Sequence, residues 1–159
     1  MDLVKVIFIC LGNICRSPTA EGVFKKYIQR ENLELKIKID SAGTGSWHTG
    51  NPPDNRSQKV AIRRGYDIAN QRSRTINNRD ITESDYIIAM DTDNFSTLQQ
   101  LVPDKMNNKL YRFLEFAPHQ NLLDVPDPYY SGPDGFDQVL SLIEDASEGL
   151  LQHIKNNDL

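Results

Sequence analysis

The stretch that decides the fold is Leu3-Val4-Lys5-Val6-Ile7-Phe8-Ile9, followed at once by Cys10-Leu11-Gly12-Asn13-Ile14-Cys15-Arg16-Ser17-Pro18. Its first seven residues form a short apolar run, which is typical of a buried β-strand. Ser17 is a favourable N-cap, and Pro18 is a favourable first helical residue. Apolar residues then recur with helical period at Ala20, Val23, Phe24, Tyr27 and Ile28. The sequence therefore predicts a strand, a tight loop and a helix in succession.

Similar segments alternate along the next part of the chain. Short apolar or alternating runs at residues 35–39, 86–90 and 109–114 predict three further strands. Asp54 is expected to cap a helix that ends at Gly65, because these residue types are common at helix starts and ends. Each predicted strand is thus separated from the next by polar or helical sequence.

The second half of the chain continues the alternation. Asp91 precedes a helix that Pro103 ends, and a final amphipathic helix carries apolar residues from Phe136 to Ile154. Strands that alternate with helices pair in parallel. We therefore predict an α/β fold, namely a doubly wound, about four-stranded parallel sheet flanked by helices, with a catalytic phosphate loop after strand 1. Residues 1–159 are expected to form a single domain.

The composition disfavours several classes of protein. The chain has 22 acidic and 18 basic residues, and this net negative charge argues against a nucleic-acid binder. It lacks both a secretion signal and an apolar run near the roughly 20 residues that cross a bilayer. We thus expect a cytoplasmic protein, without membrane insertion, that is a monomer or weak dimer. The few cysteines and histidines have no metal-ligand spacing, so neither a metal nor a cofactor is expected.

The loop after the first strand carries chemistry. A cysteine followed six places later by arginine is a weak signal alone, but here the pair joins a strand end to a helix start. Gly12 and Asn13 permit unusual backbone angles, so the N–H groups of residues 11–17 can converge on an anion at the helix N-terminus. Arg16 adds a planar fork for two phosphate oxygens. The same positive field favours the thiolate of Cys10, which makes it a candidate nucleophile.

Three residues of this loop have plainer interpretations as well. Cys10 could be a small buried residue at a strand end, although a filler does not require the polar residues around it. Cys15 either packs or forms a reversible disulfide with Cys10. Ser17 is either an N-cap alone or also a hydrogen-bond donor to the Cys10 sulfur.

Attack on a phosphoester expels an alkoxide or phenoxide, which requires a proton donor. The best candidate is Asp127 in Val125-Pro126-Asp127-Pro128-Tyr129-Tyr130. A carboxyl between two prolines is held stiffly, and the adjacent aromatics can contact an aromatic leaving group. Alone, this Asp-Pro pair would be an ordinary turn signal. Because a candidate nucleophile and a predicted phosphate site lie upstream, we interpret Asp127 as a general acid and not only as part of a turn.

The chain resembles a known family at several places along its length. The segment from Cys10 to Pro18 is similar to the signature of the low-molecular-weight protein tyrosine phosphatases. Asp40-Ser41-Ala42-Gly43-Thr44, Trp47 and Asp127-Pro128-Tyr129 match further motifs of that family in order and spacing. The resemblance extends over essentially the whole chain. It implies metal-independent hydrolysis of protein phosphotyrosine, and of small aryl phosphates, through a cysteinyl-phosphate intermediate.

The resemblance also implies roles for individual residues. Cys10 would be the nucleophile, Arg16 would bind phosphate and stabilise the transition state, and Asp127 would be the general acid. Ser17 would stabilise the thiolate as it leaves in the second step. Cys15 would be the redox partner of Cys10 in a protective disulfide, which would make the enzyme redox-sensitive.

Other residues would shape the site. Asn13 and Ser41 would brace the loop, while Trp47 and Tyr129 would wall a cleft for an aryl phosphate. Many members carry a histidine near residues 70–74 that supports the loop asparagine. Gln71 is the best-placed residue here, and its amide can donate the same kind of hydrogen bond.

Two other functions fit the same loop. A thiol-dependent arsenate reductase shares this fold but normally needs further cysteines downstream, and none follows Cys15. A catalytically silent phosphate-binding module needs neither a nucleophile nor an acid, whereas both Cys10 and Asp127 are present. We therefore expect a phosphatase whose partners are phosphotyrosine proteins, with phosphate and other oxyanions as ligands.

Overall fold

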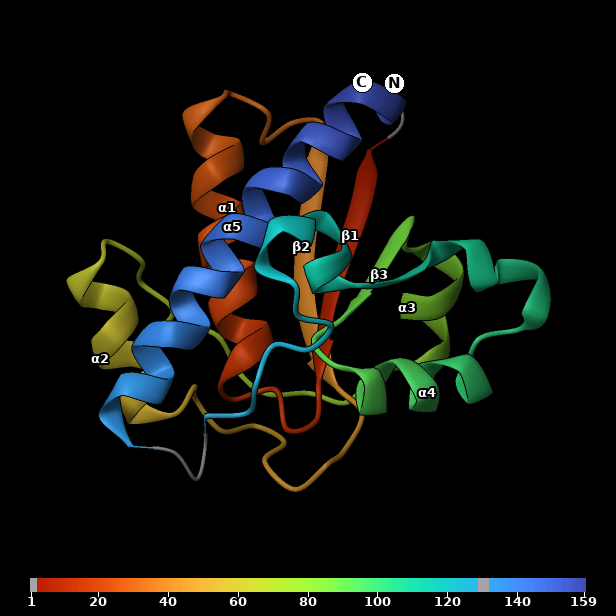
Figure 1. Cartoon of the computed structure of the whole chain (residues 1–159). Helices are drawn as coiled ribbons and strands as arrows, with labels where there is room; N and C mark the ends of the chain where they lie inside the picture. Colours follow the sequence, from red (N-terminus) through yellow and green to blue (C-terminus); the bar gives the residue numbers. More distant parts are fainter. Residues whose placement is uncertain (1–2, 129–131) are drawn as a thin grey trace.

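The computed structural model describes residues 3–128 and 132–159 (Figure 1). Its centre is a parallel four-stranded sheet in the order β2-β1-β3-β4. The strands are β1 (Val4–Cys10), β2 (Ile37–Gly43), β3 (Tyr86–Ala89) and β4 (Leu110–Arg112). The predicted α/β fold with a parallel sheet is confirmed.

Five α-helices surround this sheet in the described residues. They are α1 (Arg16–Arg30), α2 (Asn55–Arg63), α3 (Asn78–Glu83), α4 (Thr92–Leu101) and α5 (Pro133–Asp158). Short 3₁₀ turns, η1 (Asp104–Lys109), η2 (Phe113–Phe116) and η3 (Pro118–Gln120), complete the second half. None of the described helices is both long enough and apolar enough to span a membrane.

The sheet is covered on both faces because β1 is apolar on both. Val6 and Phe8 belong to one buried cluster with α1 and α5, and Phe8 meets the ring of Phe24 at a centroid distance of 5.7 Å. Ile7 and Ile9 point the other way, into a cluster with residues of α3 and α4. Figure 1 shows α1 and α5 on one side of the sheet and α3 and α4 on the other. This is the doubly wound arrangement that the sequence predicted.

Several element boundaries differ from the prediction. β2 begins and ends later than residues 35–39, because 41–43 pair with the last residues of β1. The fourth strand stops at Arg112, where the chain turns into η2. The short helix α3 was not predicted, and its start is fixed by a capping box between Asn77 and Asp80. Asp54 caps α2 as predicted, and Asp91, which was predicted only to precede a helix, caps α4.

The start of α1 also differs. The prediction of Ser17 as N-cap was wrong, because α1 already begins at Arg16 with Cys15 in the cap position. The Ser17 hydroxyl is used elsewhere, beside the Cys10 sulfur. Pro18 is therefore the third helical residue, which costs no hydrogen bond because the first-turn N–H groups have no partner within the helix.

The carboxyl ends of the strands bring distant segments together. Cys10, at the end of β1, lies opposite Gly43, at the end of β2. β3 ends just before Asp91, and the backbone N–H of Val125 donates to the Met90 carbonyl at 2.8 Å. In an open α/β sheet this edge is where ligands bind.

Candidate active site

The loop between β1 and α1 contains one residue with a positive φ angle. Asn13 has φ of 56°, in the left-handed region that asparagine tolerates. Gly12 does not have a positive φ, so the prediction that it serves an unusual backbone angle was wrong. Its bare Cα instead leaves room for His48, whose Cδ2 atom would lie 3.0 Å from an added Cβ.

The carbonyl groups of the loop are held outward by donors from the surrounding structure. A trans peptide directs its N–H opposite to its C=O, so carbonyls tied on the outside leave the N–H groups facing inward. Five carbonyls have such donors: Cys10 O accepts from Thr44 N (3.0 Å), Leu11 O from Gly45 N (2.9 Å), Gly12 O from Ser73 Oγ (2.9 Å), Ile14 O from Asp54 N (2.8 Å) and Cys15 O from Thr19 Oγ1 (2.7 Å). The loop is thus a preformed anion cradle.

The Cys10 sulfur has two hydrogen-bond neighbours at the base of this cradle. It lies 3.0 Å from Ser17 Oγ and 3.2 Å from the backbone N of Asn13. The backbone N of Arg74 donates to Asn13 Oδ1 (3.1 Å), so the Asn13 amide N points toward Ser17 Oγ and donates to it at 2.8 Å. Ser17 keeps one hydrogen of its own. When Cys10 is a thiolate, the hydroxyl donates this hydrogen to the sulfur and stabilises its charge.

Arg16 is held as a buried cation. Its side chain is 3% exposed, and Nη1 donates to Asp91 Oδ2 (2.6 Å) and to the Val125 carbonyl (2.9 Å). Burial opposes the charged form, but the negative charges of Cys10, Asp91 and Asp127 raise the pKa of the guanidinium above its ordinary value. The residue therefore stays charged when an anion enters the cradle.

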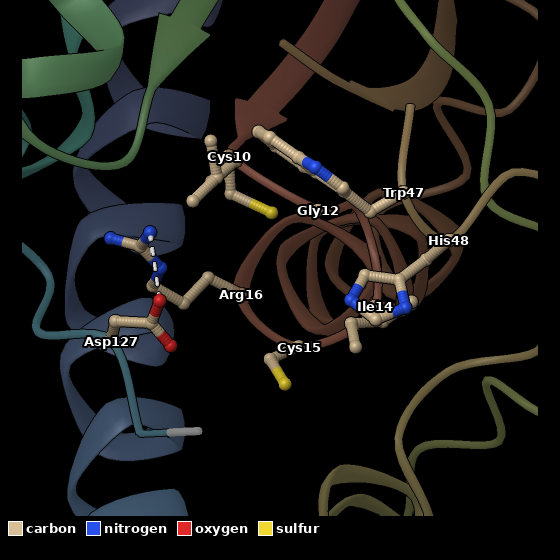
Figure 2. Close-up of a pocket in the computed structure, with 9 residues that line it drawn as sticks. Cys10, Gly12, Ile14, Cys15, Arg16, Trp47, His48 and Asp127 are labelled. Carbon is tan, nitrogen blue, oxygen red and sulfur yellow. Dashed lines mark ion pairs between the residues drawn. The ribbon is translucent and has the colours of Figure 1, made fainter. Parts of the chain in front are cut away.

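Asp127 approaches the same guanidinium from the proline-flanked loop. Its Oδ2 lies 3.7 Å from Arg16 Nη2, and its side chain is 44% exposed. Figure 2 shows Arg16 and Asp127 on one side of a pocket and His48 on the opposite side. The pocket has a volume of about 430 Å³, within the range of small-molecule sites. It is lined by Cys10, Leu11, Gly12, Ile14, Cys15, Arg16, Trp47, His48 and Asp127.

Comparison with known proteins agrees with this geometry. The family model for low molecular weight phosphotyrosine protein phosphatase matches residues 5–159. The chain belongs to this family. YfkJ of Bacillus subtilis, a low molecular weight protein-tyrosine-phosphatase, is 42% identical over 153 residues, which cover 96% of this chain and 97% of the relative. Its crystal structure superposes with a TM-score of 0.95 and covers 100% and 99% of the two chains at 40% identity.

Two further solved structures resemble this phosphatase over nearly their full length. A protein tyrosine phosphatase from Entamoeba histolytica, with Hepes in the active site, has a TM-score of 0.94 and 42% identity, with 98% and 99% of the chains covered. The Drosophila arginine phosphatase DARP has a TM-score of 0.89 and 32% identity, with 98% and 100% covered. The fold therefore hosts relatives named for two different phosphorylated side chains.

The mouth of the phosphatase pocket is partly aromatic. Trp47 lines the pocket and is 71% exposed, so its ring is available to a ligand. Tyr129, predicted as the second wall, lies outside the described residues. His48 was not predicted, and it lies against Gly12 at the rim.

Asp91 is a second residue for which the sequence predicted no role in the site. Its carboxylate has two tasks, since Oδ1 accepts from the N–H of Asn94 to cap α4 while Oδ2 accepts from Arg16. The only signal in the sequence was its place at the carboxyl end of a predicted strand, which left its partner unspecified.

Cys15 lines the pocket as a buried, free thiol. Burial raises the pKa of the Cys15 thiol to about 12, while a hydrogen bond with Ser57 acts in the opposite direction. Within the described residues, no three side chains of the metal-binding types are grouped as they would be around a metal ion.

Gln71 does not make the contact that was expected of it. Its amide N donates to the Pro18 carbonyl at 2.9 Å, and its Oε1 lies 3.5 Å from Ser41 Oγ. Asn13 Oδ1 accepts from the backbone N of Arg74. Gln71 therefore lies beside Ser41, and it is Ser41 that contacts the loop, because its Oγ accepts from the Asn13 amide at 3.1 Å.

Proposed function

We propose that this phosphatase hydrolyses phosphotyrosine in proteins, and small aryl phosphates, through a covalent phosphate ester on Cys10. One observation carries the proposal, namely that a thiol and a buried guanidinium of one loop line the same pocket as a carboxyl from a distant segment. Binding of phosphate needs only the cradle and Arg16. Hydrolysis also requires a nucleophile and a general acid, which Cys10 and Asp127 would supply.

In the first step the Cys10 thiolate attacks phosphorus in line with the leaving phenolate. The S–P bond forms and the P–O bond to the substrate breaks, while Asp127 transfers its proton to the departing oxygen. The inward N–H groups of the loop and the Arg16 guanidinium face the three equatorial oxygens, where charge spreads in the transition state. The donors are in place before the substrate arrives, so little reorganisation accompanies the reaction.

In the second step water attacks the phosphorus of the cysteinyl-phosphate. Asp127, now a carboxylate, accepts a proton from this water, and the S–P bond breaks to release inorganic phosphate and the Cys10 thiolate. The Ser17 hydroxyl supports this step, because its hydrogen is directed at the sulfur that leaves. Protons and electron pairs balance without a metal or redox partner.

The aromatic rim supports a phosphoaryl substrate. Trp47 offers a flat surface beside the cradle, and aromatic rings pack favourably in offset or edge geometry. We propose phosphotyrosine proteins of the cytoplasm as substrates, because reducing conditions there keep Cys10 as a thiol. The monomer or weak dimer, and the single domain over residues 1–159, stay predictions.

A substrate panel tests the proposed function. One peptide sequence is prepared with phosphotyrosine, phosphoserine or phosphoarginine, and phosphate release is measured with excess EDTA. We expect kcat/KM for phosphotyrosine to exceed that for phosphoserine by on the order of 100-fold, since a phenolate is the better leaving group and its ring contacts Trp47. A preference for phosphoarginine would overturn the substrate assignment, and loss of activity in EDTA would overturn the mechanism.

We also propose that Cys15 protects Cys10 during oxidation. Peroxide oxidises the Cys10 thiolate to a sulfenic acid. The Cys15 thiolate then attacks this sulfur, the S–S bond forms, and the S–O bond breaks to release hydroxide, which takes a proton from solvent to give water. The raised pKa of the Cys15 thiol keeps it protonated at neutral pH. The rate of disulfide formation should therefore rise about tenfold per pH unit between pH 7 and 9.

The redox prediction is checked by intact mass and by activity. Mild peroxide should remove two hydrogens from the protein, and dithiothreitol should restore activity. In Cys15→Ser the mass loss should be absent and recovery incomplete. Unchanged recovery in this variant would mean that Cys15 only packs.

A further inference from the structure

A glutamate outside the catalytic pocket forms a hydrogen bond with Ser41, the residue that contacts Asn13 of the catalytic loop. Glu21, on the second turn of α1, accepts a hydrogen bond from Ser41 Oγ at 2.7 Å. Its side chain borders a surface groove of about 560 Å³ between α1 and residues 65–71. This groove shares no lining residue with the catalytic pocket. Glu21 has no role in the reaction steps above.

The hydrogens between Glu21 and Cys10 can be assigned one by one. An ionised carboxylate only accepts, so the single hydrogen of Ser41 is directed at Glu21. Ser41 Oγ therefore presents its lone pairs to the Asn13 amide, which donates to it at 3.1 Å and to Ser17 Oγ at 2.8 Å. When Cys10 is a thiolate, Ser17 in turn donates to its sulfur, 3.0 Å away. The four contacts form one network that starts at a carboxylate and ends on the nucleophile.

Ser41 has a poorer acceptor as its alternative. Gln71 Oε1 lies 3.5 Å from Ser41 Oγ, at the limit of a hydrogen bond, whereas Glu21 lies at 2.7 Å and carries a charge. Bonds to ionised groups are the stronger ones, and linked bonds polarise one another. Loss of the carboxylate should thus weaken the whole network.

The groups around Glu21 act on the pKa of its carboxyl in both directions. Burial raises its pKa above the ordinary value, and the Ser41 hydrogen bond opposes that shift. The charged groups that face it are Lys25 on α1, Asp40 on β2 and Arg74 on the segment that crosses the end of β2. Asp40 raises the pKa further, whereas Lys25 and Arg74 lower it.

We infer that Glu21 is a positioning residue of the phosphatase, whose carboxylate orders the Ser41–Asn13–Ser17 network and so increases the thiolate fraction of Cys10. The inference rests on the proposed role of Cys10 as nucleophile. It assigns to a side chain outside the pocket an effect on the reacting sulfur.

The test is the pH profile of Cys10 alkylation by iodoacetamide, with the labelled cysteine identified by peptide mass mapping. Two variants separate charge from hydrogen bonding, because Glu21→Gln keeps an acceptor oxygen and Glu21→Leu removes it. We expect the alkylation midpoint to rise by about half a pH unit in Glu21→Leu, a threefold loss of thiolate below the midpoint, and by less in Glu21→Gln. Thermal unfolding shows whether each variant is folded.

The sign of the shift decides between two explanations. If Glu21 acted only as a nearby negative charge, both variants would lower the midpoint, because removal of a negative charge favours a thiolate. A lowered or unchanged midpoint in folded protein would overturn the inference. If Glu21→Leu does not fold, the rise in Glu21→Gln decides alone.

Two controls complete the design. Glu34 is an exposed carboxylate at a neighbouring groove that Glu21 also borders, so Glu34→Gln removes the same charge and should produce no rise. In a Ser41→Ala background the network is cut, and Glu21→Gln should then add no rise. An additional rise there would overturn the route through Ser41. Alkylation requires no phosphate transfer, so this result is independent of whether any aryl phosphate is hydrolysed.

Discussion

Cys10→Ser is expected to lower kcat for phosphotyrosine peptide by on the order of 10⁴-fold or more. A serine hydroxyl in the same cradle is almost entirely un-ionised at neutral pH, so the donors that favour a thiolate have no anion to stabilise. Serine is close to cysteine in size, and Cys10 is 3% exposed, so packing should be nearly unchanged. Steady-state phosphate release measures the loss.

Phosphate binding provides the control for this variant. The cradle consists of backbone N–H groups and Arg16, and neither depends on the sulfur. The Kd of inorganic phosphate, measured by calorimetry, should therefore stay within about threefold of wild type. Residual turnover within tenfold of wild type would contradict the covalent mechanism. Loss of both binding and turnover would instead indicate a damaged loop.

Asp127→Asn is expected to lower kcat for phosphotyrosine peptide by on the order of 10³-fold, because the amide cannot protonate the leaving phenolate. The loss should shrink to about tenfold for an aryl phosphate with a strongly acidic phenol, whose anion leaves without a proton. The measurement is kcat across a series of aryl phosphates. A steeper dependence on the leaving group than in wild type is the signature of a missing acid.

A matched variant guards against a general charge effect. Asp93 is an exposed carboxylate in the first turn of α4 and does not line the pocket. Asp93→Asn should leave kcat within about twofold for every substrate of the series, since surface charges away from the site have small effects. An equal loss for all leaving groups in Asp127→Asn would contradict its role as acid and indicate a role in binding.

Much of the fold could be predicted because local sequence and tertiary packing agree. The run that ends at Ile9 is apolar on both faces, and the helix after it repeats with the helical period, so a covered parallel sheet follows. β2 was misplaced because Asp40 and Ser41 look like loop residues. They are in a strand because they pair with β1, a contact that local sequence does not reveal.

The candidate site likewise contains residues that local sequence predicts and residues that only the fold reveals. That Cys10, Arg16 and Asp127 meet at one pocket could be predicted, because each lies in a short motif with its own chemical logic, while their roles in the reaction stay predictions. Asp91 and Glu21 could not, because their partners are 75 and 20 positions away and are set by the fold. The interpretation of the loop glycine failed for the same reason, since the ring that lies against it comes from another segment.

The outward carbonyl bonds of the loop have a thermodynamic consequence. Their donors come from α1 and from residues as far along the chain as Ser73. The amides are therefore aligned by the cooperative folding of the whole chain, and the entropy of ordering them is lost before any ligand is present. Affinity for phosphate is in this sense a property of the entire fold, and a loosened distant donor should weaken binding without a change in any residue that touches the ligand.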